Sequence, residues 1–178
     1  RAPKTRRITM KKNEGISPEE AIKQVQKIFR QRGKKALQMA RREILQEKIE
    51  CKEAGEALKY FMTKYWEDLA RPSLLSLVCE AVGGNPESTT PIAVPMILIS
   101  GALDIHDDII DRSVRKDGRP TVYGKFGKDI ALLVGDALLF KGLTLLNRAE
   151  EKEVPSDKMR IITEMVKNMF FELGDAEA

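Results

Sequence analysis

The sequence predicts an all-α protein, and three observations support this fold class. Apolar residues recur at a helical spacing of about 3.6 residues over most of the chain. Strong turn signals, above all Gly-Gly-Asn-Pro at positions 83–86, separate these stretches. No segment of useful length alternates apolar and polar residues as a half-buried strand does. We therefore expect one broad helical bundle.

Four helices are expected in the first half of the chain. The residues Ser-Pro-Glu-Glu at 17–20 form a capping box with Pro at the first helical position, and the helix that they open should end near Gly33. Apolar spacing predicts the next three helices, over 36–50, 54–70 and 73–82. The helix over 54–70 carries an aromatic stripe that includes Trp66, a pattern more typical of a core or an interface than of a binding site.

Three helices and one long loop are expected in the second half. A helix over 90–111 is apolar nearly all round, which predicts a central position, and Pro95 should bend it. Residues 112–127 form a loop that contains Gly, Pro and many basic residues. Apolar spacing then predicts helices over 130–146 and 156–173.

Composition favours a water-soluble protein. Charged residues make up 33% of the chain, and the longest apolar run, 91–103, falls short of the roughly 20 residues that a membrane-spanning helix needs. We therefore expect no transmembrane segment, and the N-terminus lacks the apolar stretch of a signal peptide. Cys51 and Cys79 have no CxxC spacing, which favours reduced thiols and a cytoplasmic location.

The chain divides into a basic tail over 1–16 and a helical domain over 17–178. The tail carries Lys and Arg at six positions and a single acid, Glu14. Such a tail can contact nucleic acid or an anionic surface, but it has no aromatic residues among its charges to stack on bases. We expect a solvated, flexible tail and no nucleic-acid partner.

The most informative feature is a cluster of four acids at the C-terminal end of the central helix: Asp104, Asp107, Asp108 and Asp111. Negative charge is unfavourable at a helix C-terminus, and each like-charged pair four residues apart costs roughly 0.2–0.5 kcal/mol. Stability therefore does not explain the cluster. A hard divalent cation does, because carboxylates one turn apart can share Mg²⁺ and leave sites for water and phosphate oxygens.

Two alternatives to a magnesium site follow from the same residues. A solvated acidic helix end stays open but is less favoured, because Leu and Ile flank the acids where Lys and Glu would be expected. A zinc site or a carboxylate di-iron site would need more histidines than His106, the single histidine of the chain. We expect His106 to be packed and hydrogen-bonded beside the metal site.

Basic residues follow the acids in the loop, at Arg112, Arg115, Lys116 and Arg119. Cations beside an acidic metal cluster favour a diphosphate that Mg²⁺ bridges on one side and Arg or Lys binds on the other. Because apolar helices surround the cluster, the site should hold a charged head group at the mouth of an apolar slot. A lipid diphosphate has this chemistry.

These residues resemble those of a known family. The acids at 107–111 followed by residues 116–121 are similar to DDxxDxxxxRRGxPT, the first aspartate-rich motif of the trans-isoprenyl diphosphate synthases. Further similarity to the family's GKRLRP, EALGG, FG and GDxLL segments is found at 69–72, 80–84, 126–127 and 135–139. The resemblance implies the N-terminal part of an all-α, isoprenoid-synthase-like bundle.

The resemblance also implies Mg²⁺-dependent condensation of an allylic diphosphate with isopentenyl diphosphate. The metal ions would help to ionise the allylic diphosphate, whose carbocation is attacked by the double bond of isopentenyl diphosphate. By position, Asp107 and Asp111 would be the main metal ligands, Asp108 an assisting ligand and Lys116 a diphosphate clamp. The other expected substrate contacts are cations near the head group and residues along the tail: Arg71, Arg112, Arg115, Arg119, Ala102, Ile99 and Met96.

The chain departs from the family pattern at the isopentenyl diphosphate site. The Gly, Lys and first Arg of GKRLRP fall on Glu67, Asp68 and Leu69, and the second Arg of RRG falls on Asp117. At ~4 Å and an effective dielectric constant near 20, each contact between a cation and a diphosphate is worth about 4 kcal/mol. Replacing the cation with an anion should therefore weaken binding of isopentenyl diphosphate severely. The chain also contains neither a second aspartate-rich motif nor the Lys-Thr pair of the family.

Three interpretations follow. The chain is a subunit of a hetero-oligomeric synthase whose homologous partner supplies the second aspartate-rich motif and the isopentenyl site. Alternatively, it is a catalytically silent subunit that regulates an active synthase, or a fragment of an ordinary homomeric enzyme. A fragment explains the missing motif but not Asp68 and Asp117, which lie inside the chain. The intact DDxxD favours the first interpretation over the second.

Overall fold

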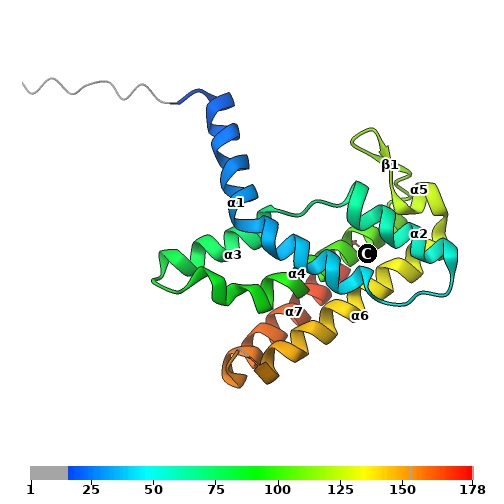
Figure 1. Cartoon of the computed structure of the whole chain (residues 1–178). Coiled ribbons are helices and arrows are strands. Elements are labelled where there is room, and N and C mark those ends of the chain that lie inside the picture. Colours follow the sequence, from blue (N-terminus) through cyan, green and yellow to red (C-terminus); the bar gives the residue numbers. More distant parts are fainter. Residues whose placement is uncertain (1–15, 153, 178) are drawn as a thin grey trace, which may run out of the picture.

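The computed structural model describes residues 16–152 and 154–177, and nearly all of them are helical (Figure 1). The elements are α1 (Pro18–Leu45), α2 (Lys52–Tyr60), the π-helix η1 (Phe61–Tyr65), α3 (Ala70–Ala81), the 3₁₀-helix η2 (Pro86–Thr89), α4 (Thr90–Ile110), the strands β1 (Arg115–Lys116) and β2 (Arg119–Pro120), α5 (Val122–Phe126), α6 (Lys128–Lys152) and α7 (Ser156–Glu177). The all-α prediction is confirmed. The predicted basic tail lies almost wholly outside the described residues.

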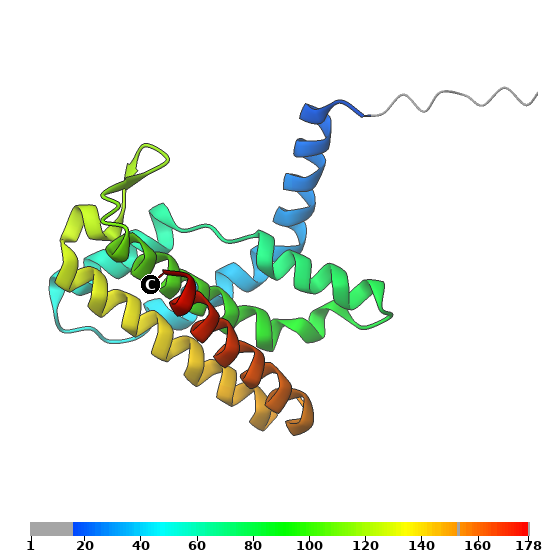
Figure 2. The same ribbon diagram turned by 180° about the vertical axis from the view of Figure 1, so that it is seen from behind.

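Helix α4 is the centre of the bundle, as its uniformly apolar sequence predicts. It packs against α6 along its length and against α1 and α3 on other sides, and α7, in red, lies in front of it in Figure 2, on the side turned away from the viewer in Figure 1. Ile97, Leu98 and Ile105 of α4 are fully buried, together with Phe61 and Leu138. By length and composition alone Pro86–Ile110 could cross a membrane, but half of this apolar window is buried inside the bundle. The expected lack of a transmembrane segment stays a prediction.

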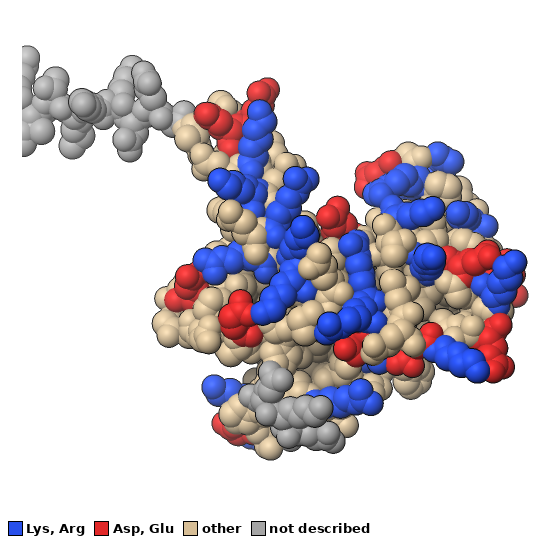
Figure 3. Space-filling model, viewed as in Figure 1, with Lys and Arg blue, Asp and Glu red and all other residues tan. Residues whose placement is uncertain are grey.

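Helix α1 continues through Gly33, where the sequence suggested an end. A Cβ at this glycine would lie 2.6 Å from the carbonyl oxygen of Leu69 and 2.8 Å from Oγ of Ser73. The residue is therefore needed where α1 crosses the start of α3, rather than as a helix terminator. Beyond this crossing the N-terminal part of α1 projects from the body, with a column of Lys and Arg on it (Figure 3).

The loop after α4 contains an antiparallel hairpin that the sequence analysis missed. Arg115 pairs with Pro120 and Lys116 with Arg119, so the turn consists of Asp117 and Gly118. Their φ angles are 50° and 74°, the left-handed pair that a tight two-residue hairpin requires and that Asp-Gly adopts most readily. Asp117 therefore has a local structural role in addition to its charge.

The helix predicted over 54–70 ends five residues early, at Tyr65. Its last turn widens into η1, where the amide of Trp66 donates to the carbonyl of Phe61, five residues back, at 2.7 Å. Trp66 then adopts an extended conformation that ends the helix. Short π-helical turns of this kind are frequently found at functional sites.

Candidate functional site

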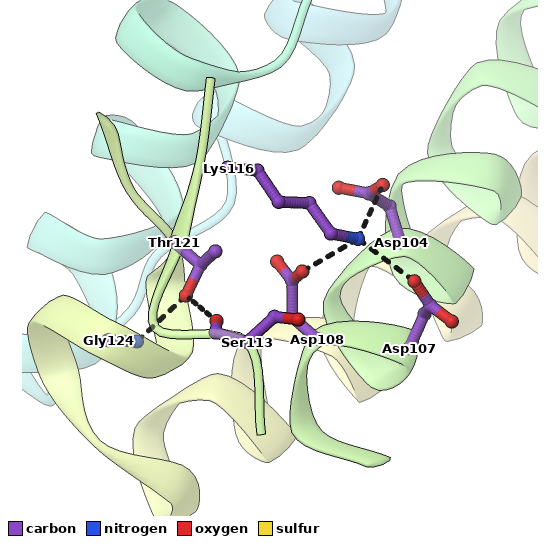
Figure 4. A network of polar contacts seen from close by, with 7 residues as sticks. All are labelled: Asp104, Asp107, Asp108, Ser113, Lys116, Thr121 and Gly124. Carbon is purple, nitrogen blue, oxygen red and sulfur yellow. Dashed lines mark hydrogen bonds and ion pairs between the residues drawn. The ribbon is translucent and has the colours of Figure 1, made fainter. Parts of the chain in front are cut away.

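Lys116 brings the hairpin back over the acid cluster of α4 (Figure 4). Its Nζ lies 2.8 Å from Oδ1 of Asp108, 2.9 Å from Oδ2 of Asp107 and 3.9 Å from Oδ1 of Asp104. The contact with Asp107 has hydrogen-bond geometry. Oδ1 of Asp108 is buried with this ammonium group as its close partner, whereas Oδ2 is buried and has no hydrogen-bond partner among the described residues. The ammonium group therefore occupies a position for which a bound metal ion would compete.

Burial and mutual repulsion change the acidity of this cluster. Loss of hydration, together with the nearby Asp108 carboxylate, raises the pKa of Asp104 to about 6. Burial also raises the pKa of Asp108, although Lys116 opposes this shift. Burial alone would lower the pKa of Lys116, but its contacts with Asp108 and Asp107 outweigh burial and raise it. One ammonium thus leaves the cluster with an excess of negative charge.

The remaining predicted head-group residues lie around the cluster without closing on it. Asp111 is the exposed C-cap of α4, and Arg112 follows it with a φ of 54°. Arg115 donates to the carbonyl of Gly118 within the hairpin. Arg119 donates to the carbonyl of Lys64 at 3.1 Å and lies 5.4 Å from the ring centre of Tyr65. Among the described residues, none of these three arginines pairs with an acid of the cluster, so their contact with a diphosphate stays a prediction.

Arg71 is held by one of the two acids that depart from the family pattern. The carboxylate of Asp68 accepts from the backbone N–H of Arg71 at 3.2 Å and from its Nη1 at 3.1 Å. The Asp68 side chain is 3% exposed and that of Arg71 is 54% exposed. Asp68 therefore caps the first turn of α3 and also balances the charge of Arg71.

Two adjoining cavities lie between α4 and α7. The first measures about 770 Å³, and its wall includes Arg71, Asp104 and Asp107 together with apolar residues of α7. The second measures about 780 Å³ and is lined mainly by apolar side chains, among them Ile92, Leu146, Ile162 and Val166. The two share three wall residues, Arg71, Ser100 and Met169. The first cavity has charged groups in a wall that is otherwise mostly apolar, and the second is mainly apolar; we call them the polar chamber and the apolar chamber. This pairing suits a ligand with a charged head and an apolar tail.

Two of the three predicted tail-contacting residues line this space. Ile99 and Met96 belong to the wall of the second cavity. Ala102 is fully buried and lines neither cavity. The contact between Ala102 and a substrate tail therefore stays a prediction, and the neighbouring residues Ser100 and Leu103 of α4 lie in the wall of the first cavity. The sequence gives the distance from the motif but not the direction in which each side chain points.

His106 is half-buried beside the cluster, but the hydrogen bond expected for it is not found, since its Nε2 has no hydrogen-bond partner among the described residues. Its Nε2 lies 3.2 Å from Oδ1 of Asp136, and a Cβ at Gly135 would lie only 2.5 Å from the same nitrogen. The Gly-Asp pair of α6 therefore makes room for the imidazole and faces it with a carboxylate. This fixes the position of α6 against the end of α4 that carries the acids.

Comparison with known proteins agrees with this geometry. The family model described as polyprenyl synthetase matches residues 51–175. The chain belongs to the polyprenyl synthetase family. Over 84 residues it is 42% identical to a geranylgeranyl diphosphate synthase of Methanosarcina mazei, a match that covers 47% of this chain and 26% of that enzyme. Over 116 residues it is 34% identical to large subunit 1 of a heterodimeric chloroplastic geranylgeranyl pyrophosphate synthase of Arabidopsis thaliana, covering 63% and 31%.

Solved structures of the family show the same fold. The crystal structure of geranylgeranyl pyrophosphate synthetase from Pyrococcus horikoshii aligns with a TM-score of 0.72 and 26% identity, over 85% of this chain and 46% of that one. The geranyltranstransferase of Thermotoga maritima aligns with a TM-score of 0.66 and 27% identity, over 80% and 52%. The chain thus spans about half the length of these polyprenyl synthetases.

The acid cluster suits a hard divalent cation that binds together with a phosphate-bearing ligand. Among the residues that the structure describes, no three Asp, Glu, His or Cys side chains converge closely enough to hold a metal by themselves. Mg²⁺, however, is commonly bound by one or two carboxylates, with water and substrate phosphate oxygens as its other ligands. The excess negative charge and the buried Oδ2 of Asp108, which has no hydrogen-bond partner among the described residues, fit such a cation.

Proposed function

We propose that this protein binds Mg²⁺ and an allylic prenyl diphosphate, as the allylic half of a trans-prenyltransferase. One observation carries the proposal: a carboxylate cluster closes one side of a polar chamber that adjoins an apolar chamber of similar size. A free diphosphate would not need the apolar chamber, and a simple lipid would not need the acids.

The residues of the chain have separate tasks in this proposal. Asp107 and Asp111 would hold the metal with Asp108 in support, and Lys116 would move from the acids to the diphosphate. Bound Mg²⁺ would supply positive charge that stabilises the leaving diphosphate. Arg71 would meet the diphosphate at the junction of the two chambers, while Ile99 and Met96 contact the tail. The apolar walls would exclude water from the reactive carbon.

We further propose that a homologous subunit supplies the isopentenyl diphosphate site. Support comes from inside the chain, because the cation expected at position 68 is a buried aspartate whose two oxygens hold Arg71. An anion at this position would repel a second diphosphate. One relative of the chain is the large subunit of a heterodimeric synthase, so a heterodimeric assembly occurs in the family.

Calorimetry with farnesyl diphosphate tests the binding proposal. The wild-type chain should bind this ligand with Mg²⁺ and lose most of its affinity with excess EDTA. Asp107→Asn should abolish the Mg²⁺-dependent part, whereas Glu56→Gln on the exposed face of α2 should leave it unchanged. Equal binding with and without metal, or by Asp107→Asn, would contradict the proposal.

Labelled isopentenyl diphosphate tests the need for a partner. The chain alone with Mg²⁺ and an allylic diphosphate should form no prenyl product, and product formed without a partner would rule out the two-subunit proposal. With a candidate partner, Asp107→Asn in this chain should abolish turnover. Unchanged turnover would instead favour the catalytically silent, regulatory role.

A further inference from the structure

We infer that Trp66 forms an aromatic wall at the head of the ligand site and contacts the first carbon atoms of a bound allylic diphosphate. This inference rests on the proposed function and adds a specificity residue to it. Trp66 lines the polar chamber together with Arg71, Asp104 and Asp107. A ligand whose diphosphate meets these charged groups must place its nearest carbons within the same chamber.

The indole has one covered face. Its ring lies 5.4 Å from the ring centre of Phe61 at an interplanar angle of 17°, which is a stacked arrangement. Phe61 is fully buried and is itself stacked on Tyr65 at 5.9 Å. Trp66 therefore ends a stack of three rings, and its surface away from Phe61 is what remains for contact with a ligand in the chamber.

Several contacts fix the indole in this position. The amide of Trp66 closes the π-helical turn onto the carbonyl of Phe61, and its carbonyl accepts from Nη2 of Arg41 at 3.1 Å. Gly101 of α4 leaves room for both rings, because a Cβ there would lie 3.0 Å from the Phe61 ring and 3.4 Å from Nε1 of Trp66. The Nε1 atom is buried and has no hydrogen-bond partner among the described residues. The surrounding residues thus hold an aromatic face at the chamber.

An aromatic face suits the chemistry expected there. It offers apolar contact to an isoprene unit. When the C1–O bond of an allylic diphosphate breaks, the electron pair leaves with the diphosphate and the allylic carbon becomes positive. The negative face of the ring attracts this carbon. Diphosphate without carbon would gain nothing from this wall. Trp66 should therefore distinguish prenyl diphosphates from inorganic pyrophosphate.

Trp66 is the single tryptophan of the chain, so intrinsic fluorescence reports on this wall directly. Titration with farnesyl thiolodiphosphate and Mg²⁺ should change its emission with the affinity that calorimetry gives, and pyrophosphate with Mg²⁺ should change it much less. A matched control moves the tryptophan, as Trp66→Phe with Val82→Trp, to an exposed site at the end of α3 that lines neither cavity. Its emission should not respond.

Substitution provides the second measurement. Trp66→Leu should bind the farnesyl analogue about 10-fold more weakly, the scale of an aromatic contact, with pyrophosphate affinity unchanged. Trp66→Phe keeps an aromatic ring on Phe61 and should lose less, and melting curves of both variants check folding. Calorimetric binding of the analogue without any change in Trp66 emission, or with unchanged affinity in Trp66→Leu, overturns the inference and leaves the proposed function standing. No binding of the analogue to the wild type overturns both.

Discussion

The carboxylate cluster shows how a single side chain can reveal what a site is built to bind. The ammonium group of Lys116 lies against three acids, Asp104, Asp107 and Asp108. It supplies one positive charge for three carboxylates. It leaves negative charge unbalanced, and this charge adds to burial, the larger cause, in raising the pKa of Asp104. Asp104 lies one turn before the motif and is outside the resemblance that identified the other acids. Its role became visible only through its contact with Lys116 and its place in the chamber wall.

Asp104 should destabilise the folded protein at neutral pH. Its pKa is about 6 in the folded state against 3.8 for an unperturbed group, so the folded state binds the proton more tightly. The contribution of Asp104 to the free energy of unfolding therefore decreases as the pH rises from about 4 through 6. Above that range the charged carboxylate destabilises the folded state by a constant amount. Asp104→Asn should raise the free energy of unfolding by about 1–3 kcal/mol at pH 7.5, because two pKa units correspond to about 2.7 kcal/mol. Urea titrations at pH 4 and 7.5 test this, since the gain should shrink at pH 4. A gain that does not depend on pH would contradict the account.

Ser100 should control passage between the two chambers, since it lies in the wall of both. Ser100→Phe should weaken binding of a geranylgeranyl diphosphate analogue more than tenfold while geranyl binding changes little, because each methylene excluded costs about 0.8 kcal/mol. Ala102→Phe provides the matched comparison. It is fully buried, so the ring should overpack the core and lower the free energy of unfolding by about 1–3 kcal/mol without selecting ligand length. Calorimetry with both ligands separates the two effects, and equal selectivity in both variants would refute this assignment.

At the level of elements, the sequence predicts long helices well and short or context-dependent features poorly. The helix at α4 was predicted to within one residue at its C-terminal end, because an apolar run ending in acids has few other interpretations. The hairpin was missed because two-residue strands have no periodicity, although Asp117-Gly118 carried the signal for its turn. The wide turn at η1 depends on tertiary contacts of Phe61 and Trp66, which periodicity does not describe. Gly33 was misread because a glycine at a helix end and one at a helix crossing look the same in a sequence.

The two glycines of the N-terminal helices should respond in opposite ways to the same substitution. Gly33→Ala places a methyl group 2.6 Å from a backbone oxygen of Leu69, so α1 and α3 must move apart, at a cost of about 1–3 kcal/mol. Gly55 in α2 has nothing within 4 Å of its added Cβ. Gly55→Ala should therefore stabilise the protein by about 0.5–1 kcal/mol through helix propensity. Thermal unfolding of both variants measures the two changes in stability. An unchanged melting temperature for Gly33→Ala would contradict the prediction.

At the scale of the whole molecule, the site depends on segments that only folding brings together. Arg71 at the start of α3, the acids of α4 and Met169 of α7 line one chamber, although about a hundred residues separate the first from the last. The aspartate motif predicts the acids and the loop lysine, since these are close in sequence. The motif does not predict that α7 forms a wall of the chamber, or that Asp68 forms hydrogen bonds with Arg71. Such pairings depend on helix packing.

The outer face of α6 should be the main interface with another chain. Leu132, Leu133, Phe140 and Leu143 are all exposed there, with Phe140 at 70%, and lie within one side of the helix. The apolar face of α2, which the sequence also suggested for an interface, is instead buried in the chain's own core at Ala57 and Leu58. An exposed apolar patch of this kind favours association.

Charges on this face should therefore prevent association without unfolding the chain. The wild type should self-associate in light scattering, and Leu133→Glu combined with Phe140→Glu should shift it to a monomer, with unfolding free energy changed by no more than about 0.5 kcal/mol because both side chains are exposed. Val82→Glu serves as control, since Val82 is 80% exposed at the end of α3, away from α6, and its replacement should leave association unchanged. The same double variant should fail to gain activity from a partner subunit while it still binds an allylic diphosphate with Mg²⁺. A wild type that stays monomeric at high concentration, or a double variant that a partner activates fully, would show that α6 is not the interface.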